Sequence, residues 1–154
     1  MNQHLQLVRT FRETFSFPQE DFGAKVSLSE IQIILHQALL MEDGGNVFKA
    51  LQGGDMAEIL NSLVDLAYCA LDAVAMQGED VREIPVSWRH DGHVISLAKL
   101  LSDKINHCMD GQTEHYSEVY CFCVHLTRSF INADFNKAFQ AVHDNYMSRL
   151  DESR

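Results

Sequence analysis

The side chains of Glu42, Asp43, Glu58, Asn61 and Asp65 have oxygen atoms that can bind a metal ion. Glu58, Asn61 and Asp65 are spaced at i, i+3 and i+7, so one side of a helix presents all three. Asp65 interrupts an apolar helical stripe, where a carboxylate needs a partner, and Glu42 and Asp43 are the nearest candidates on the preceding segment. Because Mg²⁺ prefers oxygen ligands, two such helices that face each other would form a Mg²⁺ site.

A purely structural interpretation of the same acidic residues remains open. Glu42 and Asp43 would then be surface residues of a turn, and Glu58 would stabilise the positive N-terminal end of its helix. This interpretation accounts for Glu58. It does not account for Asp65, which lies in the middle of a helix among apolar residues.

The helix that carries Asp65 is predicted between residues 56 and 77. Its apolar residues recur at three- and four-residue steps, as in a helix that buries one face. Asp55 is expected to cap its N-terminus, and Gly53-Gly54 is expected to end the segment before it.

The helix before it contains a glycine pair, Gly44-Gly45, which leaves two interpretations open. Two glycines inside a helix cost about 1 kcal/mol each relative to alanine. This cost favours a helix that ends at Asp43, followed by a short helix that Asn46 caps. The alternative is one continuous helix to Gln52.

Periodic segments at residues 2–15, 94–109, 113–130 and 133–149 predict four further helices. Thr113 is expected to cap one of them, and Ser27 or Ser29 to cap the helix that starts near residue 28, where Ser27 and Glu30 have capping-box spacing. Residues 16–27 and 78–92 are predicted connectors, and residues 151–154 a frayed tail. The sequence has two prolines and no alternating strand pattern, so we expect a single all-α domain over residues 1–154, a bundle of five to six helices.

The composition narrows the choice of partners. The formal net charge of −10 argues against a nucleic-acid backbone or an anionic membrane surface as the main partner. No uninterrupted apolar run reaches the length of a membrane span, and the N-terminal segment does not have the pattern of a signal peptide. Four cysteines lie in apolar helical segments, which is typical of reduced thiols in a cytoplasmic protein.

Cysteine and histidine residues offer a weaker alternative for metal binding. Cys121 and His125 share a helix face at i and i+4, but Cys123 points away and no C-x-x-C pair completes a zinc site. We therefore interpret the thiols as core residues. His90 and His93 flank a glycine in a connector and are expected to be solvated.

Four segments, in order along the chain, resemble the all-α nucleoside triphosphate pyrophosphohydrolases, the MazG-like and phosphoribosyl-ATP pyrophosphohydrolase-like group. Glu42-Asp43 stands where that family has a paired Glu, and Asp65-Leu66-Ala67-Tyr68 matches its D-L-L-Y element. Residues 8–18 (V-R-T-F-R-E-T-F-S-F-P) resemble the opening helix of one branch. Residues 142–150 (V-H-D-N-Y-M-S-R-L) resemble its closing V-H-x-x-N-M-S-K-L. The resemblance covers residues 5–80 and 134–150.

The resemblance implies an all-α bundle that hydrolyses a nucleoside triphosphate to monophosphate and pyrophosphate with Mg²⁺. Glu42, Asp43, Glu58 and Asp65 would hold the metal with help from Asn61, and Glu42 would orient the attacking water. The phosphates would contact Lys49, Asn145 and Arg149, although the arginine also fits a solvated cation near a helix end. Relatives commonly pair two chains, and the aromatic-rich segment 116–139 is the expected contact face of a homodimer. The alternative is that a second helical hairpin completes the bundle within one chain.

Departures from the family pattern support a second hypothesis. Asn46 replaces the third Glu of the first motif, and Asn61 stands where that branch has an Asp. Tyr146 takes the position of the family's Asn, and Arg149 that of its Lys. An Asn still offers a carbonyl oxygen but no net charge, so each exchange weakens Mg²⁺ binding. The alternative is a catalytically eroded member that binds a nucleotide or serves as an assembly module.

Overall fold

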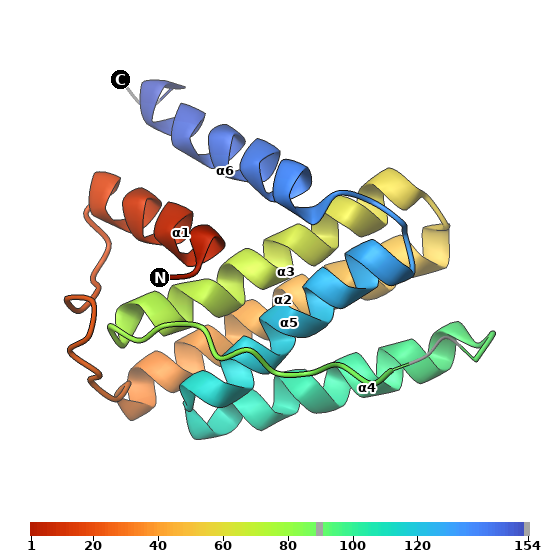
Figure 1. Cartoon of the computed structure of the whole chain (residues 1–154), viewed down its shortest axis with the longest axis horizontal. Helices are drawn as coiled ribbons and strands as arrows, with labels where there is room; N and C mark the ends of the chain where they lie inside the picture. Colours follow the sequence, from red (N-terminus) through yellow and green to blue (C-terminus); the bar gives the residue numbers. More distant parts are fainter. Residues whose placement is uncertain (89–90, 153–154) are drawn as a thin grey trace.

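The helix that carries Asp65 is the central helix of the structure (Figure 1). The computed structural model describes residues 1–88 and 91–152, and within them it contains six α-helices and no strand. The helices are α1 (Gln3–Thr14), α2 (Glu30–Gly53), α3 (Met56–Met76), α4 (Val94–His107), α5 (Thr113–Ser129) and α6 (Phe135–Glu152), with a short 3-10 helix η1 (Cys108–Asp110) after α4. The predicted all-α bundle of five to six helices is confirmed.

Helix α3 belongs to one of two helical hairpins and packs against the other hairpin and a pair of outer helices. Helices α2 and α3 form one hairpin, α4 and α5 form the other, and α3 packs against both α2 and α5 (Figure 1). Helices α1 and α6 lie together on the remaining side of α3. This arrangement brings segments from both ends of the chain against the helix that carries Asp65.

The boundaries of α3 follow from its capping residues. The side chain of Asp55 accepts hydrogen bonds from the backbone N–H groups of Ala57 at 2.9 Å and Glu58 at 3.3 Å. Gly54, in the left-handed conformation with φ of 74°, ends α2 directly before it. Both predictions at this junction are confirmed.

By length and hydropathy alone, α3 is apolar enough to cross a membrane, although it has no long uninterrupted apolar run. The other helices bury 72% of its most apolar stretch, which is how the core helix of a bundle behaves. Its apolar character is therefore accounted for by packing within the fold.

Helix α2 runs without a break through Gly44 and Gly45, so the interpretation as one continuous helix is confirmed. The two glycines differ in their surroundings. A Cβ atom at Gly44 would lie 2.6 Å from Cδ1 of Ile105 in α4, whereas one at Gly45 would meet nothing within 4 Å. Gly44 thus allows α2 and α4 to approach closely, and burial of Val47 and Ala50 holds the second half of the helix in place.

Of the two caps predicted for α2, Ser29 is confirmed, but three details of the predicted helix starts need correction. Helix α2 begins at Glu30, and its capping box joins Ser29 to Gln32 instead of Ser27 to Glu30: Ser29 Oγ accepts from Gln32 N at 3.2 Å, and Gln32 Oε1 accepts from Ser29 N at 2.8 Å. Thr113 is the first residue of α5 and not its cap. Helix α6 begins two residues later than predicted. It continues to Glu152, and the rest of the predicted frayed tail, residues 153–154, lies outside the described residues.

The connector between α1 and α2 forms a strap across the C-terminal end of α3. The backbone N–H groups of Glu20, Gly23 and Val26 donate to the carbonyl oxygens of Met76 (3.4 Å), Gly78 (2.7 Å) and Gln77 (2.9 Å). Gly78 has a φ of 68°, and a Cβ there would lie 2.3 Å from the carbonyl oxygen of Asp21. The strap therefore satisfies carbonyl groups that a helix end leaves without a partner.

The aromatic-rich segment 116–139 does not form the exposed face that we expected. Its large residues Tyr116, Phe122, Phe135 and Phe139 are fully buried in the core of the bundle. The four cysteines are buried and free, as predicted for core thiols. The expected location of a dimer contact was therefore wrong, because these rings fill the space between helices of one chain.

Candidate functional site

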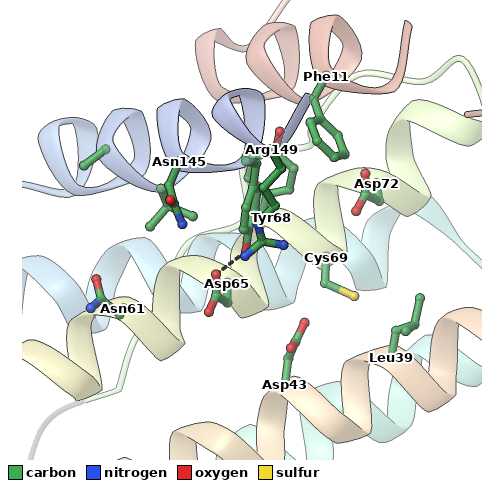
Figure 2. Close-up of a pocket in the computed structure, with 13 residues that line it drawn as sticks. Phe11, Leu39, Asp43, Asn61, Asp65, Tyr68, Cys69, Asp72, Asn145 and Arg149 are labelled. Atoms are coloured by element: carbon green, nitrogen blue, oxygen red, sulfur yellow. Dashed lines mark hydrogen bonds between the residues drawn. The ribbon is translucent and has the colours of Figure 1, made fainter. Parts of the chain in front are cut away.

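A cavity of about 560 Å³ opens between α2, α3 and α6, with Phe11 of α1 at one end (Figure 2). Figure 2 shows Asp43 on α2 and Asp65 on α3 pointing toward one another across it. Helix α6 covers the opposite side with Asn145 and Arg149. The polar residues that line the cavity are Asp43, Asn61, Asp65, Asp72, Asn145 and Arg149.

The cavity brings together five of the eight residues that the sequence predicted for metal and phosphate binding: Asp43, Asn61, Asp65, Asn145 and Arg149. The other three, Glu42, Glu58 and Lys49, are exposed and do not line it. The side chain of Glu42 points to solvent while that of Asp43 lines the cavity, because neighbouring side chains on a helix point about 100° apart. The water-orienting role expected for Glu42 therefore has no support in the position of its side chain.

Asp72 is a wall residue that the sequence reasoning missed. It lies at i+7 from Asp65, on the same face of α3, and that spacing was the signal that could have found it. Its Oδ1 accepts a hydrogen bond from the guanidinium of Arg12 at 3.0 Å, and Arg12 also donates to the carbonyl oxygen of Pro18 at 2.7 Å. Burial raises the pKa of Asp72, and Arg12 lowers it in part.

Asp43 is the carboxylate with the least compensation for its charge. Burial raises the pKa of Asp43 to about 6, and the negative charge of Asp65 contributes further. The thiol of Cys69 is the group that opposes this shift. A cation in the cavity would relieve the same repulsion, because a nearby positive charge favours the ionised carboxylate.

Asp65 is held from the side of α6. The hydroxyl of Tyr146 donates a hydrogen bond to Asp65 Oδ1 (Figure 2). Burial raises the pKa of Asp65, while this hydrogen bond and the charge of Arg149 lower it. Because both partners of Asp65 come from α6, the position of that helix determines how far the carboxylate is neutralised.

Aromatic rings form the apolar part of the cavity wall. The rings of Tyr68 and Tyr146 pack edge to face with centroids 4.9 Å apart, and Phe11 contacts both. Tyr68 Oη is hydrogen-bonded to Nδ1 of the buried His143 at 3.1 Å. The guanidinium of Arg149 lies 5.1 Å from the centre of the Tyr146 ring. The cavity thus combines an acidic side, a cation and flat apolar surfaces.

The residues of the cavity fit a cation that keeps much of its water. Within residues 1–88 and 91–152, no cluster of three or more His, Cys, Asp or Glu side chains is arranged to hold a metal ion. Mg²⁺ typically takes one or two carboxylates and completes its shell with water and substrate phosphate oxygens. The pair Asp43 and Asp65 with the amide oxygen of Asn61 matches that donor set, and a cage of protein ligands is not needed.

The other candidates from the sequence lie away from this cavity. Cys121 and Cys123 are buried, and burial raises the pKa of both thiols, which disfavours the thiolate that zinc requires. His125 lines a separate pocket, together with Arg128 and Glu83. His93 is exposed at the start of α4, and His90 lies outside the described residues.

Comparisons of the chain with protein-family models, with curated proteins and with solved structures gave no match.

Proposed function

We propose that this chain is a Mg²⁺-dependent nucleoside triphosphate pyrophosphohydrolase, with its active site in the cavity between α2, α3 and α6. The observation that supports the proposal is that Asp43 and Asp65 point toward one another across a cavity that Asn145 and Arg149 of α6 also line. The negative charge of a triphosphate is repelled by two carboxylates, and a bound cation would offset that repulsion. The motif resemblance of the sequence to the MazG-like group supports the same reaction.

Each wall of the cavity has a distinct role in this proposal. Asp43, Asp65 and Asn61 would hold Mg²⁺, which when bound neutralises phosphate charge and lowers the pKa of bound water. Arg149 would donate to phosphate oxygens in the paired geometry that a guanidinium allows. The rings of Tyr68 and Phe11 offer a flat apolar surface to the nucleoside.

The proposed reaction needs one proton acceptor. A water oxygen forms a bond to the α-phosphorus, the bond from that phosphorus to the bridging oxygen breaks, and pyrophosphate leaves with the electron pair. Asp43 would accept the water proton on a carboxylate oxygen that does not hold the cation, because it lines the cavity opposite Asp65. Asp43 thus takes the role that the sequence assigned to Glu42, whose side chain is exposed.

A specific contact favours a second candidate function, nucleotide binding without hydrolysis. The hydroxyl of Tyr146 already occupies Oδ1 of Asp65, and Tyr146 stands where the resembled family has an Asn. Asn61 adds no charge to the donor set. A site of this kind would bind Mg²⁺ and a nucleotide weakly and leave the phosphate chain intact.

Two measurements on the native chain separate these functions. The first follows the unfolding temperature with Mg²⁺, with a nucleoside triphosphate and with both, because a ligand that binds only the folded state stabilises it. The second screens a panel of triphosphates for pyrophosphate release. We expect Mg²⁺-dependent stabilisation and release, both lost in Asp65→Asn and retained in the control Asp103→Asn, whose Asp is exposed on α4.

The results of these two measurements distinguish hydrolysis, nucleotide binding and a purely structural role. Stabilisation without release assigns the chain to the binding function. No response to Mg²⁺ or to any triphosphate contradicts both functions. Loss of stability in Asp65→Asn that is equal with and without Mg²⁺ would show a structural carboxylate, because a lost hydrogen bond costs the same in either condition.

A further inference from the structure

A second pocket, of about 250 Å³, lies between α2 and α4 and shares no lining residue with the acidic cavity. Its apolar lining comes from Met41, Gly44, Gly45 and Phe48 of α2 and from Ile105 of α4. None of the described residues that line it carries a charge. A ligand of this pocket must therefore be neutral, because a charged group would lose its hydration there without gaining an opposite charge.

Gly45 indicates that something from outside the chain occupies this pocket. A glycine in the middle of a helix is less stable than an alanine, so its presence needs a reason. At Gly44 the reason is the close approach of Ile105, whose Cδ1 would lie 2.6 Å from a Cβ. At Gly45 a Cβ would meet nothing within 4 Å, so packing among the described residues does not require a glycine. Without a side chain at Gly45, another molecule can approach the backbone of α2.

Gln37 supplies the polar group of the pocket. Its side chain lines the pocket and is 7% exposed, and its Nε2 donates to the carbonyl oxygen of Ile105 at 3.0 Å. This bond sets the orientation of the amide. The Oε1 atom of Gln37 is buried and has no hydrogen-bond partner among the residues that the structure describes. A buried acceptor without a partner destabilises a fold, so this oxygen indicates a donor that the chain itself does not provide.

We infer that the pocket between α2 and α4 binds a neutral aromatic molecule of one or two fused rings with a single hydrogen-bond donor. An apolar cavity of roughly 150 Å³ holds benzene, so this larger pocket has room for two fused rings. The rings would lie against Gly45 and Phe48, and the N–H or O–H group would donate to Gln37 Oε1. Met41 at the mouth is 63% exposed, and its flexible thioether packs well against an aromatic ring.

This inference is independent of the chemistry proposed for the acidic cavity, because it rests on different residues. The acidic cavity takes a charged ligand together with a cation. The pocket between α2 and α4 takes a neutral ligand and needs no metal ion. Removal of divalent cations should therefore leave its affinity unchanged.

The test uses indole, which is neutral and has two fused rings and one N–H donor. Titration of indole into the native chain labelled with nitrogen-15 should shift the amide signals of Gly44 and Gly45 until they saturate. Indene has the same shape without the N–H group, and it should bind about fivefold more weakly, as expected for the loss of one hydrogen bond. Equal binding of indene and indole would overturn the inferred class of ligand.

Gly45→Leu localises the binding, because the new side chain fills the pocket. The Gly44 amide of this variant should no longer respond to indole, while the unfolding temperature stays at or above that of the native chain, since a helix favours leucine over glycine. Gly53→Leu is the matched control. A Cβ at Gly53 also meets nothing within 4 Å, and Gly53 does not line the pocket, so this variant should bind indole as the native chain does.

A second variant keeps the test valid if Gly45→Leu fails to fold. Ser102→Leu fills the pocket from α4, where Ser102 is exposed, and it should also abolish the response. Absence of a saturable shift at millimolar indole overturns the inference, as does unchanged binding in Gly45→Leu and Ser102→Leu. Shifts of the two glycine amides that follow protein concentration instead of indole would overturn it as well and assign the pocket to a contact between chains.

Discussion

Replacement of Asp43 by Asn should stabilise the fold at neutral pH when no divalent cation is present. Burial and the charge of Asp65 raise the pKa of Asp43 from 3.8 to about 6. A carboxyl group whose pKa is raised on folding does not lower the free energy of unfolding well below pH 3.8, where it is protonated in both the folded and the unfolded chain. Its cost grows as the pH rises toward 6, because the unfolded chain releases the proton first, and it is complete above pH 6.

The size of the effect follows from that shift. A tenfold change in proton affinity corresponds to 1.36 kcal/mol, so the whole penalty is at most ~3 kcal/mol. Asn keeps the size of the side chain and removes the charge, so we expect Asp43→Asn to gain 1–2 kcal/mol, roughly half of that limit. Urea unfolding at pH 8 and pH 4 measures it, and the gain should vanish at pH 4. The exposed Asp103→Asn on α4 should show no such pH dependence.

Addition of Mg²⁺ gives a second test of the stability difference between the native chain and Asp43→Asn. Millimolar Mg²⁺ should stabilise the native chain at pH 8 and leave Asp43→Asn almost unchanged, so the gap between them should close. A variant that is less stable than the native chain by the same amount at both pH values would refute this reasoning. Asp43 would then act as a structural hydrogen-bond acceptor, with the Cys69 thiol as the neighbouring donor.

Three further substitutions in α2 test its packing and its buried histidine. Gly45→Ala should stabilise the chain by about 1 kcal/mol, because alanine favours a helix and no atom lies near the new Cβ. Gly44→Ala should be neutral or destabilising by ~1–2 kcal/mol, because its Cβ would lie 2.6 Å from Ile105. Thermal unfolding of both variants measures the difference, and an equal gain in both would contradict the close approach of α2 and α4. His36→Gln should reduce the loss of stability between pH 6.5 and pH 4: burial lowers the pKa of His36 to about 4, so only the unfolded chain takes up a proton in that range. Urea midpoints at pH 7 and pH 5 measure it, and an unchanged difference between them would show that His36 is not the group responsible.

Local sequence patterns predicted the helix that carries Asp65 because its determinants are local. Asp55 and Gly54 fix its start through their own backbone geometry, and its apolar residues are buried by several neighbouring helices at once. The glycine pair in α2 could not be settled in this way. Local propensity argued for a break, and the deciding contact, Gly44 against Ile105, joins residues that lie about sixty positions apart.

The candidate site was predicted in part for the same reason. Asp65 could be recognised because it interrupts an apolar stripe, but the partner of Asp72 is Arg12, sixty positions away on another helix. The orientation of α2 was equally hidden. The long-range bonds of His36 to α3 and of Gln37 to α4 help to set which side of this helix faces outward, and no local pattern reveals them.

The strap between α1 and α2 restricts how this sequence can drift over evolutionary time. Connectors on a protein surface usually accept insertions, deletions and exchanges freely. Here the backbone of residues 20–26 is hydrogen-bonded to the last carbonyl groups of α3, and any side chain at position 78 would collide with the carbonyl oxygen of Asp21. A longer strap and a larger residue at Gly78 damage the same contact, so neither change is neutral by itself. The two segments can diverge only together, although more than fifty residues separate them along the chain.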